Sequence, residues 1–249
     1  CVMFLIVGYQ IMYPGDSAAN LYWSHFGFML GEDNTLEAVL GSNGDIYYST
    51  AADFFFQVVF VATAMSIVSG AVAERMKLWA FLAFAVVMTS FIYPVQGFWN
   101  WGGGFLGESF GYSDYAGSGT VHLCGASAAL AGVIFLGARK GKYGPDGQIN
   151  AIPGSNLPLA ALGTFILWLG WFGFNGGSEL AVSSLESANN VARVFLNTNG
   201  AAAGGVISAL IVSQILFGKA DLTMALNGGL AGLVAITADP LTSGAGWAT

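Results

Sequence analysis

An acid and a histidine enter an apolar stretch of this chain eight residues apart. The run begins at Asp114, continues as Tyr-Ala-Gly-Ser-Gly-Thr-Val and ends at His122. Ionisable side chains are costly inside a lipid bilayer, and those that occur there commonly line a path for ions, protons or substrate. Helical geometry would place His122 roughly 12 Å below Asp114. The pair therefore predicts a transport path.

Both residues also have a structural explanation. Asp114 can cap the helix that begins near it by accepting backbone N–H bonds, and we favour that role, which still allows Asp114 to shape the mouth of the path. A desolvated imidazole stays neutral, so His122 can line a narrow passage or relay a proton. The alternative for His122 is a hydrogen bond across a helix interface.

The composition indicates that the elements around these residues span a membrane. The chain has 249 residues, of which 55% are hydrophobic and 8% are charged, against about 25% charged in soluble domains. Full-length apolar stretches reach the ~20 residues that a membrane helix needs, and their continuity argues against barrel strands. We expect an all-α polytopic membrane protein with spans at about 1–13, 54–72, 78–97, 119–138, 157–177, 198–218 and 223–238.

The basic residues predict the orientation, because cytoplasmic loops collect Lys and Arg. All but Arg193 fall in three alternate loops, as Arg75, Lys77, Arg139, Lys140, Lys142 and Lys219. The opposite, outer side is acidic, with Asp16, Glu32, Asp33, Glu37, Asp45, Glu108, Glu179 and Glu186. Such a face enriches cations, and the lack of a basic patch argues against a nucleic-acid partner.

Small residues spaced four apart predict close helix packing within the bundle. They occur as Ala128-x-x-x-Gly132, Gly200-x-x-x-Gly204 and Gly228-x-x-x-Gly232. Gly- and Ala-rich segments also produce this spacing by chance, so the pattern identifies no particular contact.

The outer ends of four regions combine aromatic rings, a hydroxyl and a carboxylate. The residues are Phe56, Gln57, Phe60, Trp101, Asp114, Trp171, Phe174 and Ser178. Aromatic faces attract cations, and hydroxyl or carbonyl oxygens accept their hydrogen bonds. The mixture suits a small cation, although any single aromatic residue here also fits an interfacial belt.

Several motifs resemble the Amt/Mep/Rh ammonium transporters across nearly the whole chain. They are Asp114 to His122, Gly70-Ala-Val-Ala-Glu-Arg75, Asn156-Leu-Pro-Leu, Gly170-Trp-Phe-Gly-Phe-Asn-Gly-Gly-Ser178 and Asn197-Thr-Asn. The run Trp101-Gly-Gly-Gly and the Phe174/Ser178 pattern favour the Amt branch over the Rh branch. In the family motif, Glu74 and Arg75 are expected to organise the inner loop.

The resemblance implies an eleven-helix fold with inverted repeats, assembled as a homotrimer with one pore per subunit. Residues 1–249 would be a single transmembrane transporter domain truncated at both ends, running from about the second to the eighth helix, seven of the eleven. A plasma or inner cell membrane, no cofactor or metal, and a P-II type regulator at the cytoplasmic face are the corresponding expectations. A second pore histidine is expected beyond Thr249.

The resemblance also implies roles for individual residues. Trp101, Ser178 and Phe60 would bind ammonium at an outer site, and Phe60 and Phe174 would form stacked rings that close the pore below it. Asp114 would support the site with Gln57 nearby, and His122 would be the first of two pore histidines. Ammonium would be recruited and deprotonated, and ammonia and the proton would pass by separate routes.

Other classes of function remain open at this point. An ammonium-sensing receptor would carry a signalling domain beyond residue 249, and a passive ammonia channel of the Rh kind would be electrically silent. A Na⁺-coupled symporter is less consistent, because no segment is broken midway. An enzyme is not expected, since no nucleophile, base and orienting group recur together.

Overall fold

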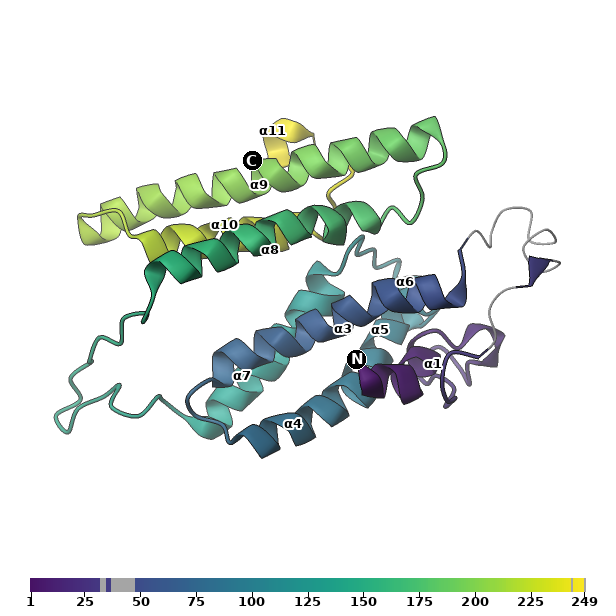
Figure 1. Ribbon diagram of the computed structural model, residues 1–249, viewed down its shortest axis with the longest axis horizontal. Helices are drawn as coiled ribbons and strands as arrows, with labels where there is room; N and C mark the ends of the chain where they lie inside the picture. The colour runs from purple at the N-terminus through teal and green to yellow at the C-terminus, as the bar shows by residue number, and fades with distance from the viewer. Residues whose placement is uncertain (32–34, 37–47, 243, 249) are drawn as a thin grey trace. The chain divides into compact units, whose positions relative to one another are not determined.

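The computed structural model describes residues 1–31, 35–36, 48–242 and 244–248. Within them, five helices are long and apolar enough to cross a membrane: Thr50–Val72, Leu78–Phe110, Ser118–Leu136, Leu157–Gly177 and Leu185–Phe217. Leu222–Ile236 is a shorter apolar helix. The chain is therefore a multi-pass α-helical membrane protein (Figure 1), as the composition predicts. Glu32, Asp33, Glu37 and Asp45, which are predicted to face the outer side, lie outside the described residues.

The chain divides into two compact units, each of which is described by itself. The first comprises Cys1–Ser113 and Gly119–Asn150, and the second comprises Asp114–Ser118 and Ala151–Thr249. The boundary falls inside the Asp114 to His122 motif, so that Asp114 belongs to the second unit and His122 to the first.

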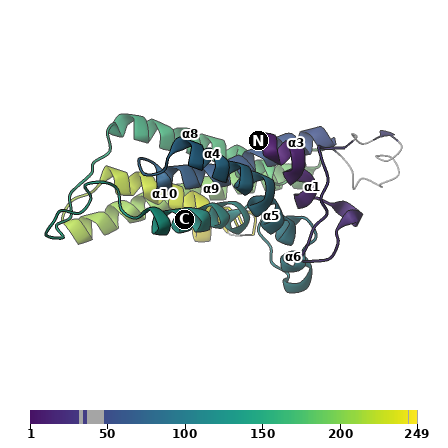
Figure 2. The same cartoon turned by 90° about the horizontal axis from the view of Figure 1, so that it is seen from below.

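The first unit contains six α-helices in its described residues, joined by short π and 3₁₀ segments. In chain order the elements are η1 (Phe4–Gly8), α1 (Tyr9–Met12), η2 (Gly15–Ser17), α3 (Thr50–Val72), α4 (Leu78–Val87), η3 (Met88–Ile92), α5 (Tyr93–Trp101), α6 (Phe105–Phe110), η4 (Ser118–Leu123) and α7 (Cys124–Leu136). The first residue of η4, Ser118, belongs to the second unit. Helices α5 and α6 follow each other closely (Figure 2). Between them the chain turns at Gly103, which has a positive φ of 82°, a conformation that glycine adopts without steric cost.

Local sequence explains how the helices around the candidate site begin and end. Ser49 caps α3, because its hydroxyl accepts a hydrogen bond from Ala52 N at 3.1 Å. The π-helix η3 connects α4 to α5, and Pro94 follows it in the first turn of α5. Proline in the first turn of a helix removes no obligatory hydrogen bond. Trp101 is the last residue of α5.

An aromatic core holds the start of the chain against α3 and α5. Phe4 is fully buried, and its ring centroid lies 6.0 Å from that of Phe54 and 6.4 Å from that of Tyr93. The Tyr9 hydroxyl donates to Asp53 at 2.5 Å. Ring pairs of this kind add about 0.5–1.5 kcal/mol each beyond the apolar area that they bury.

Two loops of this unit, which the charge pattern predicts to be inner loops, are joined through the Gly70-to-Arg75 motif. Arg139 forms an ion pair with Glu74 at 2.7 Å, and Arg75 donates to the Gly137 carbonyl at 2.5 Å. The contact connects the end of α3 to the end of α7, which agrees with a loop-organising role for Glu74 and Arg75.

The second unit contains α8 (Leu157–Gly177), α9 (Leu185–Phe217), α10 (Leu222–Ile236) and α11 (Ala245–Ala248). Each of the first three begins at a polar cap: the side chains of Asn156, Ser184 and Asp221 accept hydrogen bonds from backbone N–H groups. Asp221 lies outside the apolar helix, and hydrogen bonds from Thr223 and from Met224 N lower the pKa of its carboxyl. The α9 and α10 helices lie side by side (Figure 1).

Small residues allow the backbones of α9 and α10 to touch. A Cβ added at Gly228 would overlap the Gly205 carbonyl oxygen, and one added at Gly232 would overlap the Ala201 carbonyl oxygen. The predicted Gly228-x-x-x-Gly232 stripe thus makes a close helix contact. Its partner on α9 is formed by Ala201 and Gly205, displaced by one residue from the predicted Gly200 and Gly204.

Replacing Gly232 with valine is expected to destabilise the protein by about 1–3 kcal/mol, because the added side chain has no space. Gly163 is the matched control: it lies within α8, and a Cβ there meets nothing within 4 Å among the described residues. Thermal unfolding of the purified intact protein should show a lower midpoint for Gly232→Val and no comparable loss for Gly163→Val. Equal midpoints for the two variants would contradict the close packing.

Candidate functional site

Three aromatic rings gather where α3 and α5 meet. The ring centroids of Phe60 and Trp101 lie 6.1 Å apart at an interplanar angle of 85°, and Phe56 lies 4.7 Å from Phe60. Phe60 is 1% exposed, and Trp101 is half-buried. The structure thus brings together two of the three residues predicted for the outer site, and their faces can attract a cation.

A hydrogen-bond network that includes Asn100, the neighbouring residue in α5, holds the Trp101 side chain. With its amide oriented to satisfy every neighbour, Asn100 accepts from Trp101 Nε1 at 3.1 Å and from Thr120 Oγ1 at 2.9 Å. The Asn100 amide nitrogen donates to the Tyr112 carbonyl at 3.0 Å, and Gln96 Nε2 donates to the Thr120 carbonyl at 2.7 Å. Sequence reasoning missed this network, although Gln96 and Asn100 stand four apart at the end of an apolar helix.

His122 is buried in η4, at the start of the membrane-length helix Ser118–Leu136. It is 6% exposed, between the fully buried Val121 and the exposed Leu123. The π-turn geometry of η4 is a rare conformation that often occurs at functional sites. Gln57 is 8% exposed in α3, and its Oε1 has no hydrogen-bond partner among the described residues. The first unit therefore contains a buried imidazole and an available buried acceptor.

The second unit carries the hydroxyl and the other predicted gate residue. Ser178, the residue after α8, donates its hydroxyl hydrogen to the Phe174 carbonyl at 2.8 Å, which leaves the lone pairs of its oxygen available to a ligand. The Phe174 ring lies 5.9 Å from Trp171. The structure thus places Phe174 and Ser178 next to each other.

A buried hydrogen-bond network supports this end of α8. Trp171 Nε1 donates to Thr237 Oγ1 at 2.8 Å, and Thr237 Oγ1 lies 3.1 Å from Asn175 Oδ1. Asn175 Nδ2 in turn donates to Thr198 Oγ1 at 3.0 Å. Satisfied buried networks rigidify their surroundings, so this one fixes α8 against α9 and α10.

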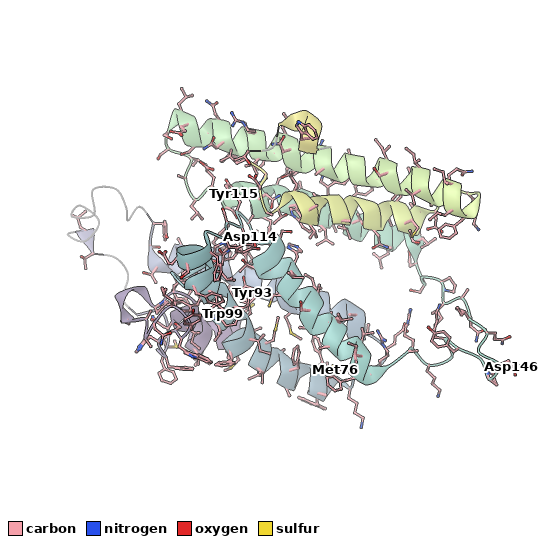
Figure 3. The ribbon with its side chains drawn as sticks, turned by 180° about the vertical axis from the view of Figure 1, so that it is seen from behind. Met76, Tyr93, Trp99, Asp114, Tyr115 and Asp146 are labelled. Atoms are coloured by element: carbon pink, nitrogen blue, oxygen red, sulfur yellow. The ribbon has the colours of Figure 1, made fainter. Side chains whose placement is uncertain are left out.

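Asp114 caps the turn that leads into η4. Its Oδ1 accepts from Gly117 N at 3.0 Å and from Ser118 N at 2.9 Å, and the residue is 3% exposed. The next two backbone amides bond to the end of α10: Tyr115 N donates to the Ala238 carbonyl at 2.8 Å, and Ala116 N donates to the Thr237 carbonyl at 3.0 Å. Asp114 and Tyr115 are labelled in Figure 3. The capping role that the sequence favours for Asp114 is present.

The predicted site residues thus fall into two groups. Phe60, Trp101, Gln57 and His122 belong to the first unit, and Phe174, Ser178 and Asp114 belong to the second. The pairings of Phe60 with Phe174 and of Trp101 with Ser178 join residues of different units and stay predictions. No group of three metal-ligating side chains occurs in the part of the chain that the structure describes.

The fold and these residues define a polytopic α-helical membrane protein with a buried histidine and an aromatic pair. A sequence profile of the Ammonium Transporter Family matches residues 1–243. The chain belongs to this family.

Several named ammonium transporters are similar in sequence to this chain. The chain is 46% identical over 228 residues to ammonium transporter Amt2 of Archaeoglobus fulgidus, covering 86% of this chain and 47% of that protein. It is 36% identical over 234 residues to an ammonium transporter of Aquifex aeolicus, covering 94% of this chain and 51% of that protein. The chain thus spans about half the length of these relatives.

Solved structures have the same fold. The structure of a protein titled Sensor Amt Protein matches with a TM-score of 0.83 and 39% sequence identity, over 99% of this chain and 58% of that one. The crystal structure of Candida albicans Mep2 matches with a TM-score of 0.83 and 25% identity, over 99% of this chain and 52% of that one. The predicted ammonium transporter fold is confirmed.

Proposed function

We propose that the intact protein transports ammonium across a cell membrane, through a pore that His122 lines. The observation that carries the proposal is a histidine only 6% exposed in an apolar helix of a chain from this family. Ionisable side chains buried in membrane-spanning helices commonly line a path for ions, protons or substrate. The aromatic pair Phe60 and Trp101, in the same unit, supplies a cation-attracting surface.

In the proposed mechanism the cation is first held outside the pore. The faces of Trp101 and Phe60 attract ammonium, the Ser178 oxygen accepts one of its N–H bonds, and Asp114 and the Gln57 oxygen support the site. Carrying the charge farther into apolar surroundings would cost several kcal/mol. Ammonium therefore loses a proton, neutral ammonia passes the rings of Phe60 and Phe174, and the proton travels separately along a relay that includes His122.

Replacing Trp101 with leucine should raise the substrate concentration for half-maximal uptake by about tenfold, because the cation–π attraction is lost. The maximal rate should change less, since the residues deeper in the pore are untouched. Methylammonium uptake by the intact protein, measured across a concentration series, checks this. Trp79→Leu is the control, because Trp79 is 80% exposed and lies at the start of α4, outside the cluster of Phe56, Phe60 and Trp101. Unchanged concentration dependence in Trp101→Leu would remove the outer-site assignment.

We further propose a homotrimer with one pore per subunit, in a plasma or inner cell membrane, whose cytoplasmic face meets a P-II type regulator. Family membership supports these assignments. The pattern of basic residues favours a cytoplasmic loop at Arg139, Lys140 and Lys142. Mass determination of the purified intact protein in a lipid-like environment distinguishes a trimer from other assemblies.

A second candidate function is ammonium sensing on the same fold. A specific observation favours it: the matching structure titled Sensor Amt Protein is 39% identical to this chain. A sensor would bind ammonium at the outer site with little flux. Saturable ammonium binding by the intact protein, without uptake into liposomes, would favour sensing over transport.

A further inference from the structure

Glu179 joins three segments at the outer end of the second unit. Its Oε2 accepts a hydrogen bond from the Tyr115 hydroxyl at 2.7 Å, and its Oε1 accepts one from Asn190 Nδ2 at 2.8 Å. Tyr115 follows Asp114 directly, Glu179 follows Ser178 directly, and Asn190 lies in the second turn of α9. One carboxylate therefore connects the loop of Asp114 to the residue next to Ser178.

The position of this carboxylate needs an explanation. The carbonyl end of a helix carries a partial negative charge, so an acid just after α8 is electrostatically unfavourable. The chain also turns sharply here, with Leu180 at a φ of 60°, a conformation that non-glycine residues adopt at a cost. Hydrogen bonds from two neutral donors offset the first cost and hold the turn in place.

The Tyr115 hydroxyl, which is the hydrogen-bond donor from the Asp114 loop, is protonated at physiological pH. Burial, and then the hydrogen bond to Glu179, raise the pKa of Tyr115 well above its usual range. The phenol therefore keeps its proton and donates it to the carboxylate. The loop is further ordered by its own amides, since those of Tyr115, Ala116, Gly117 and Ser118 are all hydrogen-bonded.

We propose that Glu179 is a positioning residue, which fixes the Asp114 loop relative to Ser178 through Tyr115 and Asn190. This inference rests on the proposed function, because Asp114 and Ser178 belong to the proposed outer site. Its effect on transport is indirect: Glu179 holds the segments that carry the site and is itself occupied by Tyr115 and Asn190. An alternative is that the carboxylate acts only by its charge, attracting cations to an acidic outer face.

Replacement variants separate positioning from charge. Tyr115→Phe removes only the donor, and Glu179→Ala removes both contacts; each should raise the KM for methylammonium about three- to tenfold with little change in the maximal rate. Glu179→Gln keeps one acceptor oxygen for Asn190, and its amide N–H can donate to the Tyr115 hydroxyl, which then accepts, so both contacts persist and the wild-type KM should be retained. The double variant Tyr115→Phe/Glu179→Ala should be no worse than Glu179→Ala. Glu186→Ala, which removes an exposed acid from the first turn of α9, is the control for charge.

Hydrogen exchange of the intact purified protein provides a readout that is independent of transport. Amides of residues 115–118 should exchange faster in Tyr115→Phe and Glu179→Ala, and at the wild-type rate in Glu179→Gln and Glu186→Ala. If Glu179→Gln is as impaired as Glu179→Ala, the carboxylate acts through its charge and not by positioning the loop. If Tyr115→Phe keeps the wild-type KM and the wild-type exchange rates, the inference is wrong. If the wild-type protein shows no uptake, the proposed transport function fails, and exchange alone decides whether Glu179 holds the loop.

Discussion

Replacing His122 with alanine is expected to lower the ammonium-driven current of the intact protein on the order of 100-fold, the usual scale for losing a proton-transferring group. His122 is buried in η4, so bulk water has little access to replace it in the transfer of a proton. A neutral imidazole donates with one nitrogen and accepts with the other, which suits a relay along a dry path. Current recorded from proteoliposomes after an ammonium pulse measures the effect.

The matched control for this variant is Val121→Ala, in the same π-turn. Val121 is fully buried, so its truncation removes packing without removing a polar group. We expect Val121→Ala to be less stable than wild type and still to carry most of the current. If His122→Ala conducts like wild type, or if Val121→Ala loses as much current, His122 serves packing and the proposed relay is wrong.

Truncating Phe174 to alanine is the second large effect that we expect. The proposal places the Phe174 ring across the pore with that of Phe60, so that hydrated ions are excluded. Its loss should admit K⁺ and reduce the selectivity for ammonium by roughly tenfold or more, which corresponds to about 1.4 kcal/mol of barrier. Currents measured with ammonium and with K⁺ as the cation give the ratio directly.

Phe165→Ala is the control for the gate. Phe165 lies in α8 like Phe174, but its side chain is 63% exposed in the structure, so its loss should leave selectivity unchanged. Surface expression and thermal stability of both variants separate a pore effect from a folding effect. A Phe174→Ala protein that folds, reaches the membrane and still excludes K⁺ would place the barrier elsewhere.

The helical membrane fold could be predicted because hydropathy and loop charge act over whole segments. Helix boundaries were harder, as α9 illustrates: an apolar span is apparent only at about 198–218, yet the helix begins at Leu185. Its first turns are polar, and Ser184 caps them. Its 33 residues would extend for about 50 Å, well beyond a hydrocarbon core of about 30 Å. Arg193, the basic residue that falls in none of the three basic loops, lies in the polar part of α9 before the apolar span.

The candidate site could be predicted only in part, because sequence motifs suggest residues but not the contacts between helices. The ring contact between Phe60 and Trp101 joins residues from separate helices, and a motif resemblance could suggest that pair without its geometry. The hydrogen bonds around the candidate residues were missed. Glu179 with Tyr115, and Asn175 with Thr198, pair residues 64 and 23 positions apart. Such hydrogen bonds depend on how helices pack, and nothing in the periodicity of one segment indicates them.

Charge movement during ammonium transport tests the central claim most directly. The intact protein should be reconstituted in proteoliposomes, and ammonium pulses applied while current and uptake are recorded together. We expect a saturable current that accompanies uptake, with a half-maximal concentration that Trp101→Leu raises and an amplitude that His122→Ala nearly abolishes. Uptake without current would indicate passive ammonia flow, and binding without uptake would indicate a sensor. Either result would contradict proton-coupled passage along the path lined by His122.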